Sequence, residues 1–456
     1  MSKIIYRLNE NPRGRVLWLS SLQWFVFTIA NIITVPIVLG HAFALEEYEI
    51  ALMTSRTLLL CGLIGVLQVF VGHKLPIIEG PASMWWGVFL ILLELNHDAG
   101  KSNLILLREL EWGLIAGSMV FILLALSGLL NKIRILFTPA ITGTFLILLA
   151  LQVSKSLLEG VLGIGFHGST TVKTSIILMS LILIGLTIGL MRKGKGILQN
   201  ISVLISLLVG WGMYAMLGML TFTPFSAQLI ALPQLFPFGP PLFNWGIVLT
   251  SAVTSVILMS NFIASVQVIS KLAEVQVTNK VYSRGVFISG IGTLLTGCLG
   301  TVGIVPLTSG ASLVAFTGIA SRLPFLLSST IIAIVGLVPS VGQLLATIPA
   351  PVGYAVLFTV FGQMIGFGLR DIQTLSLDQR DIFVVGFSIL AGVGSLFIEG
   401  KAWADLPPLF GFIFGNGLIV GVVIAILLEH LVFRKNQGTT KNSVNYRNSQ
   451  AEAKNT

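Results

Sequence analysis

The chain has 456 residues, of which 55% are hydrophobic and only 10% are charged, and its mean hydropathy is +0.94. A soluble protein of this length carries about 25% charged residues and could not bury so much apolar side chain in its core. The composition therefore excludes a soluble enzyme, a nucleic-acid-binding protein and a disordered scaffold, and the net charge of +9 fits basic residues gathered in the cytoplasmic loops of a membrane protein.

Apolar stretches of about 20 residues recur along the whole chain, which is the length that a helix needs to span a hydrocarbon layer about 30 Å thick. We predict an all-α polytopic membrane protein with a cytoplasmic N-terminus at residues 1–16, no cleavable signal peptide, and a disordered cytoplasmic tail at residues 434–456. Between them we place fourteen transmembrane segments, in chain order at residues 17–40, 52–72, 75–95, 112–131, 137–155, 174–192, 197–220, 245–270, 284–302, 303–320, 323–346, 350–369, 382–398 and 407–433.

The basic residues between the segments indicate the orientation of the chain. With the N-terminus inside, 21 of the 27 Lys and Arg residues fall on the cytoplasmic side, and the six on the outside are Arg56, Lys101, Arg108, Lys155, Lys173 and Lys401. A wrong number of segments would exchange the two sides partway along the chain and blur this bias. We therefore expect a multi-pass protein of the plasma membrane with both termini in the cytoplasm.

The cysteines and histidines do not indicate a metal site or a disulfide framework. The two cysteines, Cys61 and Cys298, both lie in apolar stretches, and the five histidines show no metal-ligand spacing. The chain also has no nucleotide-binding loop, so ATP-driven transport is not expected. We predict neither a cofactor nor a bound metal.

The third and tenth segments are irregular, because they hold clusters of Gly, Pro and Ser where a plain spanning helix would hold Leu and Val. These clusters begin at Glu79 and Leu307, and the first and eighth segments begin near Leu17 and Trp245, so both pairs are 228 residues apart. Two halves of seven segments each must insert in opposite orientations. Inverted repeats with a broken helix at the same place in each half are typical of a transporter whose site lies at mid-membrane.

Several short motifs occur in the order found in one transporter family. The chain resembles the nucleobase:cation symporter-2 family, also called nucleobase/ascorbate transporters, over essentially its full length. The matching positions are Leu22-Gln23-Trp24, Val35-Pro36, Leu75-Pro76 with Gly80, Phe137-Thr138-Pro139-Ala140, Thr317-Gly318, and Ile348-Pro349-Ala350-Pro351-Val352.

This resemblance implies a fold of 7+7 inverted repeats with short extended strands in segments 3 and 10. It divides the chain into a core domain (17–131 and 245–346) and a gate domain (137–220 and 350–433), with the base bound between the two strands and segment 8. It also implies a homodimer.

The chain departs from the family at two important positions. Relatives usually carry one carboxylate on segment 8 and another at the head of the segment 10 motif, and these positions are Asn261 and Ser309 here. The chain therefore looks like a divergent, purine/pyrimidine permease-like member of the family.

Segment 8 carries polar residues on one helical face, because Thr250, Thr254, Asn261 and Ser265 are 4, 7 and 4 residues apart. Asn261 offers a donor and an acceptor to a heterocycle, and Ser265 follows it by one turn. The alternative is that these small polar residues join neighbouring helices.

In segment 10, Thr308, Ser309 and Gly310 would expose hydroxyl groups and backbone amides to a substrate if the chain is extended there. Irregular backbone at membrane depth is tolerated only where it is buried in protein or lines a cavity. The alternative is tight packing of small residues.

Further candidates come from segments 1 and 3. Ser83 aligns with an aromatic residue that flanks the base in relatives, and the buried amide of Gln23 needs a partner. A planar base favours an aromatic face, which Trp85, Trp86 or Trp24 could supply, although Trp residues are also common anchors at the membrane interface.

Glu79 is the candidate for proton coupling. If residues 75–79 are extended, they reach about 16 Å into the membrane, which is roughly the midplane of a hydrocarbon core about 30 Å thick. A carboxylate there is costly unless it is neutral or paired, which suits a reversible proton carrier. If the segment instead begins as a helix, Glu79 lies near the inner interface and pairs with Lys74.

The leading hypothesis is a permease that is not an enzyme: a secondary active transporter of a purine-type nucleobase such as xanthine, guanine or urate, coupled to protons or, alternatively, to sodium. Two other functions stay open. One is an anion carrier of the same 7+7 architecture, resembling the sulfate permease group, and the other is a membrane sensor that does not transport.

Overall fold

The computed structural model describes residues 4–98, 100–129, 138–166, 169, 171–195, 197–220, 228, 230–398, 402 and 414–433. The predicted tail at residues 434–456 and the motif residue Phe137 lie outside these residues. In the first half, the elements are α1 (Gly14–Ile32), α2 (Thr34–Ala42), α3 (Glu47–Phe70), β1 (Glu79–Pro81), α4 (Ser83–Asp98), α5 (Asn103–Ser127), α7 (Pro139–Val161), α8 (Thr174–Lys193), α9 (Ile197–Asn200) and α10 (Ser202–Met216).

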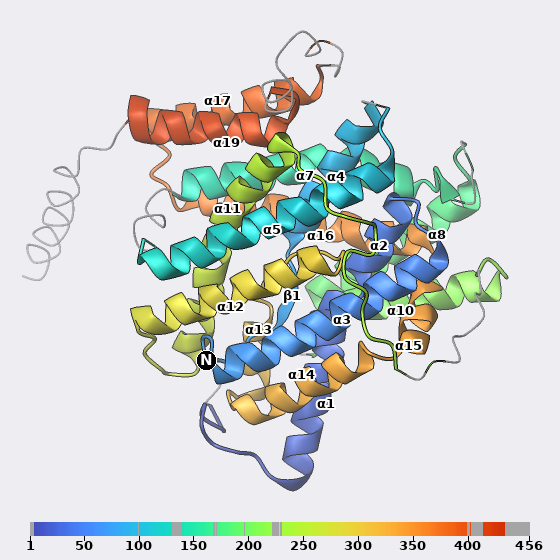
Figure 1. Ribbon diagram of the computed structural model, residues 1–456, viewed down its shortest axis with the longest axis vertical. Helices are drawn as coiled ribbons and strands as arrows, with labels where there is room; N and C mark the ends of the chain where they lie inside the picture. Colours follow the sequence, from blue (N-terminus) through green and yellow to red (C-terminus); the bar gives the residue numbers. More distant parts are fainter. Residues whose placement is uncertain are drawn as a thin grey trace, which may run out of the picture.

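The second half has a similar order of long helices and one short strand (Figure 1). Its elements are α11 (Trp245–Leu272), α12 (Asn279–Cys298), β2 (Ile304–Pro306), α13 (Gly310–Thr317), α14 (Arg322–Val335), α15 (Pro339–Ala346), α16 (Ala350–Gln373), α17 (Gln379–Leu396), α19 (Gly417–Leu427) and the π-helical turn η3 (Leu428–Val432). Apart from two short strands among the described residues, the protein is thus an all-α polytopic membrane protein.

Among the described residues, eight helices are long and apolar enough to cross a membrane, and α1 with α2 count as one of them. The pair α14 and α15 could form a ninth span, although the two helices are bent by 85°. Shorter apolar helices occur at α10 and at α19 with η3. The count of fourteen segments stays a prediction.

Local chemistry explains where several helices begin and end. Pro36 has no N–H group to donate to the carbonyl of Ile32, and α1 ends at that residue. Thr138 caps α7, whose first residue is Pro139, and α16 begins between Pro349 and Pro351. Asn244 caps α11 by accepting hydrogen bonds from two backbone N–H groups.

The two strands form an antiparallel pair in the centre of the molecule. The register pairs Glu79 with Pro306 and Pro81 with Ile304, and all six strand residues are buried. Backbone bonds from Leu307 to Ile78 (2.8 Å) and from Ala82 to Gly303 (3.1 Å) extend the pairing by one residue at each end. Each strand leads into a helix, α4 after β1 and α13 after β2, as inverted repeats with broken helices require.

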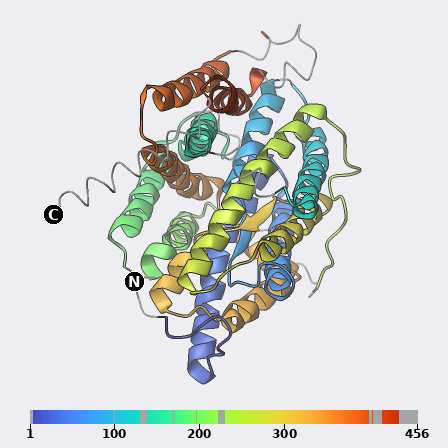
Figure 2. The same ribbon diagram turned by 90° about the vertical axis from the view of Figure 1, so that its left-hand side faces the viewer.

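The helices pack in two groups. One contains α1, α3, α5, α11, α12 and α14, and the other contains α7, α8, α10, α16, α17 and α19. Figure 2 shows the second group mainly at the left, in green and orange-red, and the first mainly at the right, in blue, cyan and yellow. The groups meet where α4 packs on α7 and α2 packs on α16. The division into a core and a gate domain that move against each other stays a prediction.

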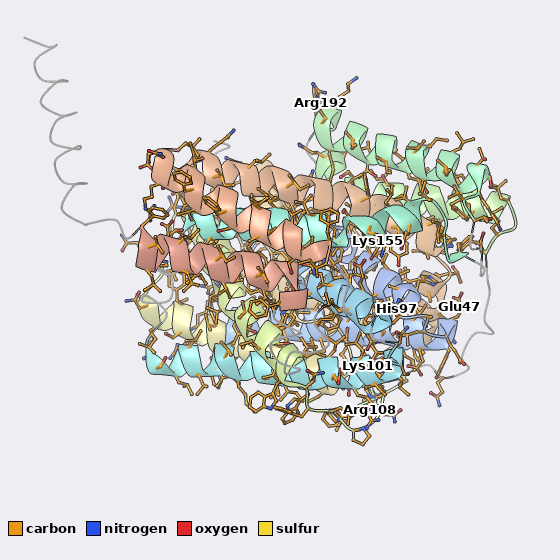
Figure 3. All side chains as sticks on the ribbon, turned by 90° about the horizontal axis from the view of Figure 1, so that it is seen from above. Glu47, His97, Lys101, Arg108, Lys155 and Arg192 are labelled. Carbon is orange, nitrogen blue, oxygen red and sulfur yellow. The ribbon has the colours of Figure 1, made fainter. Side chains whose placement is uncertain are left out.

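One end of the molecule gathers charged residues from both groups. Figure 3 shows Glu47, His97, Lys101 and Lys155 together at this end. The sequence assigns Lys101 and Lys155 to the outer side, so this end is the predicted outer face.

Candidate functional site

The site begins with the two helices that follow the strands. The first residues of α4 and α13 lie directly after the buried strand pair, at Ser83 and Gly310. The first backbone N–H groups of a helix have no partner within it and carry a partial positive charge. The fold therefore brings two helix N-termini to the middle of a membrane protein, where a polar ligand can be bound without a charged side chain.

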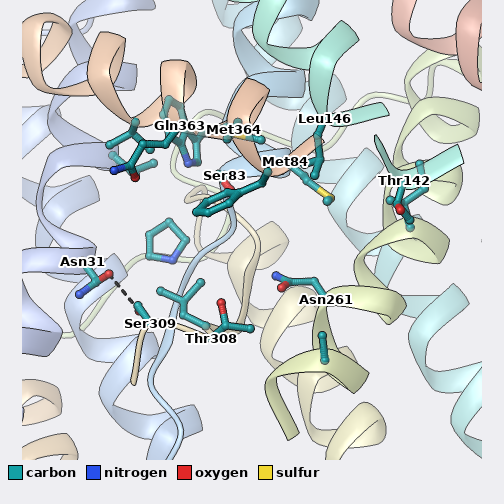
Figure 4. Close-up of a pocket in the computed structure, with 18 of the residues that line it drawn as sticks. Asn31, Ser83, Met84, Thr142, Leu146, Asn261, Thr308, Ser309, Gln363 and Met364 are labelled. Atoms are coloured by element: carbon teal, nitrogen blue, oxygen red, sulfur yellow. Dashed lines mark hydrogen bonds between the residues drawn. The ribbon is translucent and has the colours of Figure 1, made fainter. Parts of the chain in front are cut away.

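A cavity of about 610 Å³ lies next to these helix ends, between the two groups of helices. Figure 4 shows Ser83, Asn261, Thr308 and Ser309 around it, with Gln363 and Met364 on the opposite wall. A volume of this size is typical of a small-molecule site. The polar side chains that line it are Asn31, Thr34, Ser83, Thr142, Asn261, Gln267, Thr308, Ser309, Gln363 and Asp371.

Four of the predicted binding residues line this cavity: Ser83, Asn261, Thr308 and Ser309. The Ser309 hydroxyl donates a hydrogen bond to Oδ1 of Asn31 at 3.2 Å (Figure 4), and the Asn31 amide donates to the carbonyl of Phe27. Within the described part of the chain, the side-chain amide of Asn261 makes no hydrogen bond, and its donors and acceptor are available to a ligand.

The two tryptophans at the start of α4 point in different directions. Trp86 lines the cavity and packs edge-to-face on Phe361, with ring centres 4.4 Å apart. Trp85 is fully buried away from the cavity, in a slot where an added Cβ on Gly303 would lie 2.4 Å from the indole and one on Gly117 would lie 3.1 Å from it. Of the pair, Trp86 is therefore the aromatic wall and Trp85 a packing residue.

The other predicted binding residues lie outside the lining. The Ser265 hydroxyl donates to the carbonyl of Pro306 at 3.0 Å and joins α11 to β2. Gly310 begins α13 behind Ser309, and an added Cβ there would lie 3.5 Å from the ring of Trp24, which packs on Phe325. Gln23 is partly buried on α1, away from the cavity.

The second group of helices supplies lining residues that the sequence reasoning missed. Gln363 and Asp371 come from α16, and Thr142 comes from α7 and donates to Asp371 at 3.0 Å. A signal for the α16 residues was present, because positions 360, 363, 364, 367 and 371 follow one helical face. The binding residues predicted from the sequence all lie on segments 1, 3, 8 and 10.

Glu79 is the first residue of β1, is fully buried and does not line the cavity. Residues 75–78 are not helical, and within the described chain the carboxylate of Glu79 faces the imidazole of His73, with Nε2 and Oε1 3.5 Å apart. The alternative in which a helical start pairs Glu79 with Lys74 is therefore wrong. A fully buried carboxylate at this depth must be neutral or stabilised by a partner.

Comparison with known proteins gives consistent matches. Residues 15–400 match the model of the Permease family (Xan_ur_permease). The chain is 32% identical to the Bacillus subtilis (strain 168) protein named "Putative purine permease YwdJ", over 91% of this chain and 95% of that protein. It is 25% identical to the uric acid permease PucJ of the same organism (90% and 91% covered) and 22% identical to its xanthine permease (92% and 94%).

Solved structures of transporters share the fold. The transmembrane domain of the cyanobacterial bicarbonate transporter BicA superposes with a TM-score of 0.61 at 16% identity, covering 91% of this chain and 99% of that domain. The murine anion transporter Slc26a9 in its inward-facing state superposes with a TM-score of 0.67 at 12% identity, covering 92% and 69%. At this identity the likeness concerns the fold alone.

Proposed function

The chain belongs to the nucleobase:cation symporter-2 family, and we propose that it carries a purine-type nucleobase across the membrane by secondary active transport. Xanthine, guanine and urate are the expected kinds of substrate. The relatives named for purine, uric acid and xanthine transport support this class of substrate, and the chain covers almost the whole length of each of them.

The observation that carries the proposal is the chemistry of the cavity. Its wall combines the unoccupied amide of Asn261, hydroxyl groups from the ends of both strands, and the indole of Trp86. A purine has a flat aromatic face and a polar edge with donors and acceptors, and it requires this combination. We expect the edge to contact Asn261 and the hydroxyl groups of Ser83, Thr308 and Ser309.

An anion carrier is the second candidate function, because BicA and Slc26a9 share the fold. The described lining contains no Lys or Arg, and it does contain the carboxylate of Asp371. A small inorganic anion would be held by neutral donors and helix N-termini, without a positive side chain, and repelled by this carboxylate. The cavity therefore favours a neutral or weakly acidic heterocycle.

A panel of ligands tests the substrate class on purified protein. Xanthine, guanine or urate should raise the melting temperature in a concentration-dependent way, because a ligand that binds only the folded protein stabilises it. Sulfate and bicarbonate should give no shift. A shift with bicarbonate or sulfate and none with bases would favour the anion carrier, and no shift with any ligand would favour a sensor that does not transport.

We propose further that transport is coupled to protons through Glu79. The carboxylate is fully buried in β1 and faces His73, so binding and release of one proton changes the charge within this strand. Because Pro81 of the same strand lines the cavity, this change is two residues away from the cavity wall.

The Glu79→Gln variant tests the coupling. It should bind and exchange the base but should no longer accumulate it in response to an inward proton gradient, because the amide cannot carry a proton. Glu46→Gln, at an exposed position before α3, is the matched control and should behave as the wild type. An unchanged response of Glu79→Gln to the gradient would exclude proton coupling through this residue.

A further inference from the structure

The buried pair of His73 and Glu79 has a geometry that coupling at Glu79 alone does not explain. Both side chains are 0% exposed, and Nε2 of His73 lies 3.5 Å from Oε1 of Glu79. Among the described residues, neither His73 Nε2 nor either carboxylate oxygen has a hydrogen-bond partner. The imidazole is therefore the polar group to which this carboxylate is directed.

The backbone determines which ring nitrogen carries the proton. The N–H group of Leu75 donates a hydrogen bond to Nδ1 of His73 at 3.1 Å. A nitrogen that accepts a hydrogen bond is unprotonated, so the proton of the neutral ring is on Nε2, the atom that faces Glu79. The turn after α3 thus presents one N–H donor to the carboxylate.

Neighbouring residues hold the ring in this orientation. Gln68 accepts a hydrogen bond from the backbone N–H of His73 at 3.2 Å and donates to the carbonyl of Gly285 and the hydroxyl of Ser289. Gly285 leaves room for the histidine, because an added Cβ would lie 3.1 Å from the Cβ of His73. These contacts tie the turn to α12.

The charged and titratable groups that interact with the pair come from two elements, α3 and α14. Cys61 of α3 is fully buried and interacts electrostatically with Glu79, and Arg322 at the start of α14 interacts with His73. Arg322 also donates from Nε to the carbonyl of Lys74 at 2.5 Å. From α11 and α12, the groups next to His73 are the Phe262 ring and the neutral residues bound by Gln68.

We propose that His73 is a positioning residue that stabilises the unprotonated form of Glu79 through its Nε2–H group and so sets the proton concentration at which the carrier releases its proton. This inference rests on the proposed proton coupling at Glu79. Glu79 does not line the cavity, and proton release then occurs next to the turn at Lys74, which Arg322 of α14 contacts. The base and the proton accordingly have separate sites that β1 connects, because Pro81 of the same strand lines the cavity.

Two substitutions of His73 separate the roles of its ring nitrogens. The amide nitrogen of Gln occupies nearly the position of Nε2 and keeps a donor toward Glu79, whereas Asn occupies the position of Nδ1 and keeps only the bond from Leu75. Without the donor, Glu79 holds its proton to a higher pH, because an N–H group that faces a buried carboxylate favours its charged form.

The measurement is the rate of gradient-driven base uptake into proteoliposomes as a function of the internal pH, at a fixed external pH. His73→Asn should move the half-maximal internal pH upward by about one unit, and His73→Gln should leave it near the wild-type value. A merely structural role would lower the rate without moving this midpoint.

The results for the His73 and Glu79 variants distinguish the role of His73 from proton coupling through Glu79. If Glu79→Gln abolishes the gradient response while His73→Asn keeps the wild-type midpoint, coupling through Glu79 stands and the role of His73 is wrong. Equal shifts in the Asn and Gln variants would also overturn it. If Glu79→Gln responds normally to the gradient, proton coupling through Glu79 and the role of His73 are both wrong.

A spectroscopic test does not depend on the folding of the Asn variant. Nuclear magnetic resonance of the ¹⁵N-labelled histidines in lipid reports which ring nitrogen carries the proton. The signal of His73 is identified by its absence from the spectrum of His73→Gln. In the wild type it should show a neutral ring protonated on Nε2. Protonation on Nδ1 would overturn the inference.

Discussion

Among individual residues, Asn261 has a side-chain amide that faces the cavity and makes no hydrogen bond within the described chain. We predict that Asn261→Ala weakens binding of the base by more than about 1 kcal/mol, since the polar edge of the ligand would lose its partner in a dry site. Thr250→Val, on the same helix but bonded to the carbonyl of Gly246, is the control and should bind normally. Unchanged affinity of Asn261→Ala in a titration would make Asn261 a helix-packing residue.

Gly303 is a second residue whose role can be tested directly. A Cβ added there would lie 2.4 Å from the indole of Trp85. We predict that Gly303→Ala lowers the free energy of unfolding by about 1–3 kcal/mol, because overpacking forces the ring or the strand to move.

Thermal unfolding in lipid nanodiscs measures this effect. The control is Gly212→Ala in α10, where nothing lies within 4 Å of the added methyl group. Equal melting temperatures for Gly303→Ala and the wild type would show that Trp85 is not tightly held.

Sequence reasoning located some site residues and not others for identifiable reasons. Asn261 and Ser309 could be found because they replace carboxylates of a motif that the chain otherwise resembles. Trp85 and Trp86 could not be separated, because neighbouring helical residues differ by about 100° in direction and the orientation of α4 comes from its tertiary contacts. The proximity of His73 to Glu79 depends on the turn after α3, which has no motif.

At the scale of elements, α7 and α16 each line a cavity at both of their ends. The site cavity contacts the start of α7 and the end of α16, and a second cavity of about 480 Å³ contacts the end of α7 and the start of α16. Between them, α4 bears Trp86 on the first cavity and Leu90 on the second. The helix α4 therefore contributes to the walls of both cavities.

An ion pair joins α4 and α7 at the second cavity, which lies on the predicted outer side. Lys155 of α7 lies 3.0 Å from Glu94 of α4, and the two side chains are 66% and 27% exposed. A pair this exposed contributes about 0.2–1 kcal/mol. We predict that Glu94→Gln opens the outer cavity more often, so that a cysteine placed at Ser156 reacts up to about fivefold faster with an impermeant thiol reagent.

Exchange of the two charges provides the control. The double variant Glu94→Lys with Lys155→Glu should restore slow labelling, since it rebuilds the pair in reverse. A labelling rate that is the same in Glu94→Gln and in the wild type would show that the pair is only a surface contact.

The broken elements were predictable from composition, because Gly, Pro and Ser at Glu79–Ser83 and Leu307–Ser312 cannot continue a plain apolar helix. The antiparallel strand pairing agrees with the inverted repeat. The bend of 85° between α14 and α15 was not predicted, since Pro339 and Gly336 lie within an apolar run that is long enough for one straight span.

At the scale of the whole molecule, the orientation in the membrane follows from the loop charges. A cysteine at Lys101, on the predicted outer face (Figure 3), should react with impermeant thiol reagents added to intact cells, and one at Lys193 should react only after permeabilisation. Labelling of Lys193→Cys from outside would contradict this orientation.

Uptake into proteoliposomes with and without an imposed pH gradient shows whether the protein carries purine bases together with protons. We predict saturable uptake of xanthine, guanine or urate that an inward proton gradient drives to accumulation, and that unlabelled purine bases inhibit but sulfate and bicarbonate do not. Uptake of bicarbonate or sulfate without uptake of any base would contradict it.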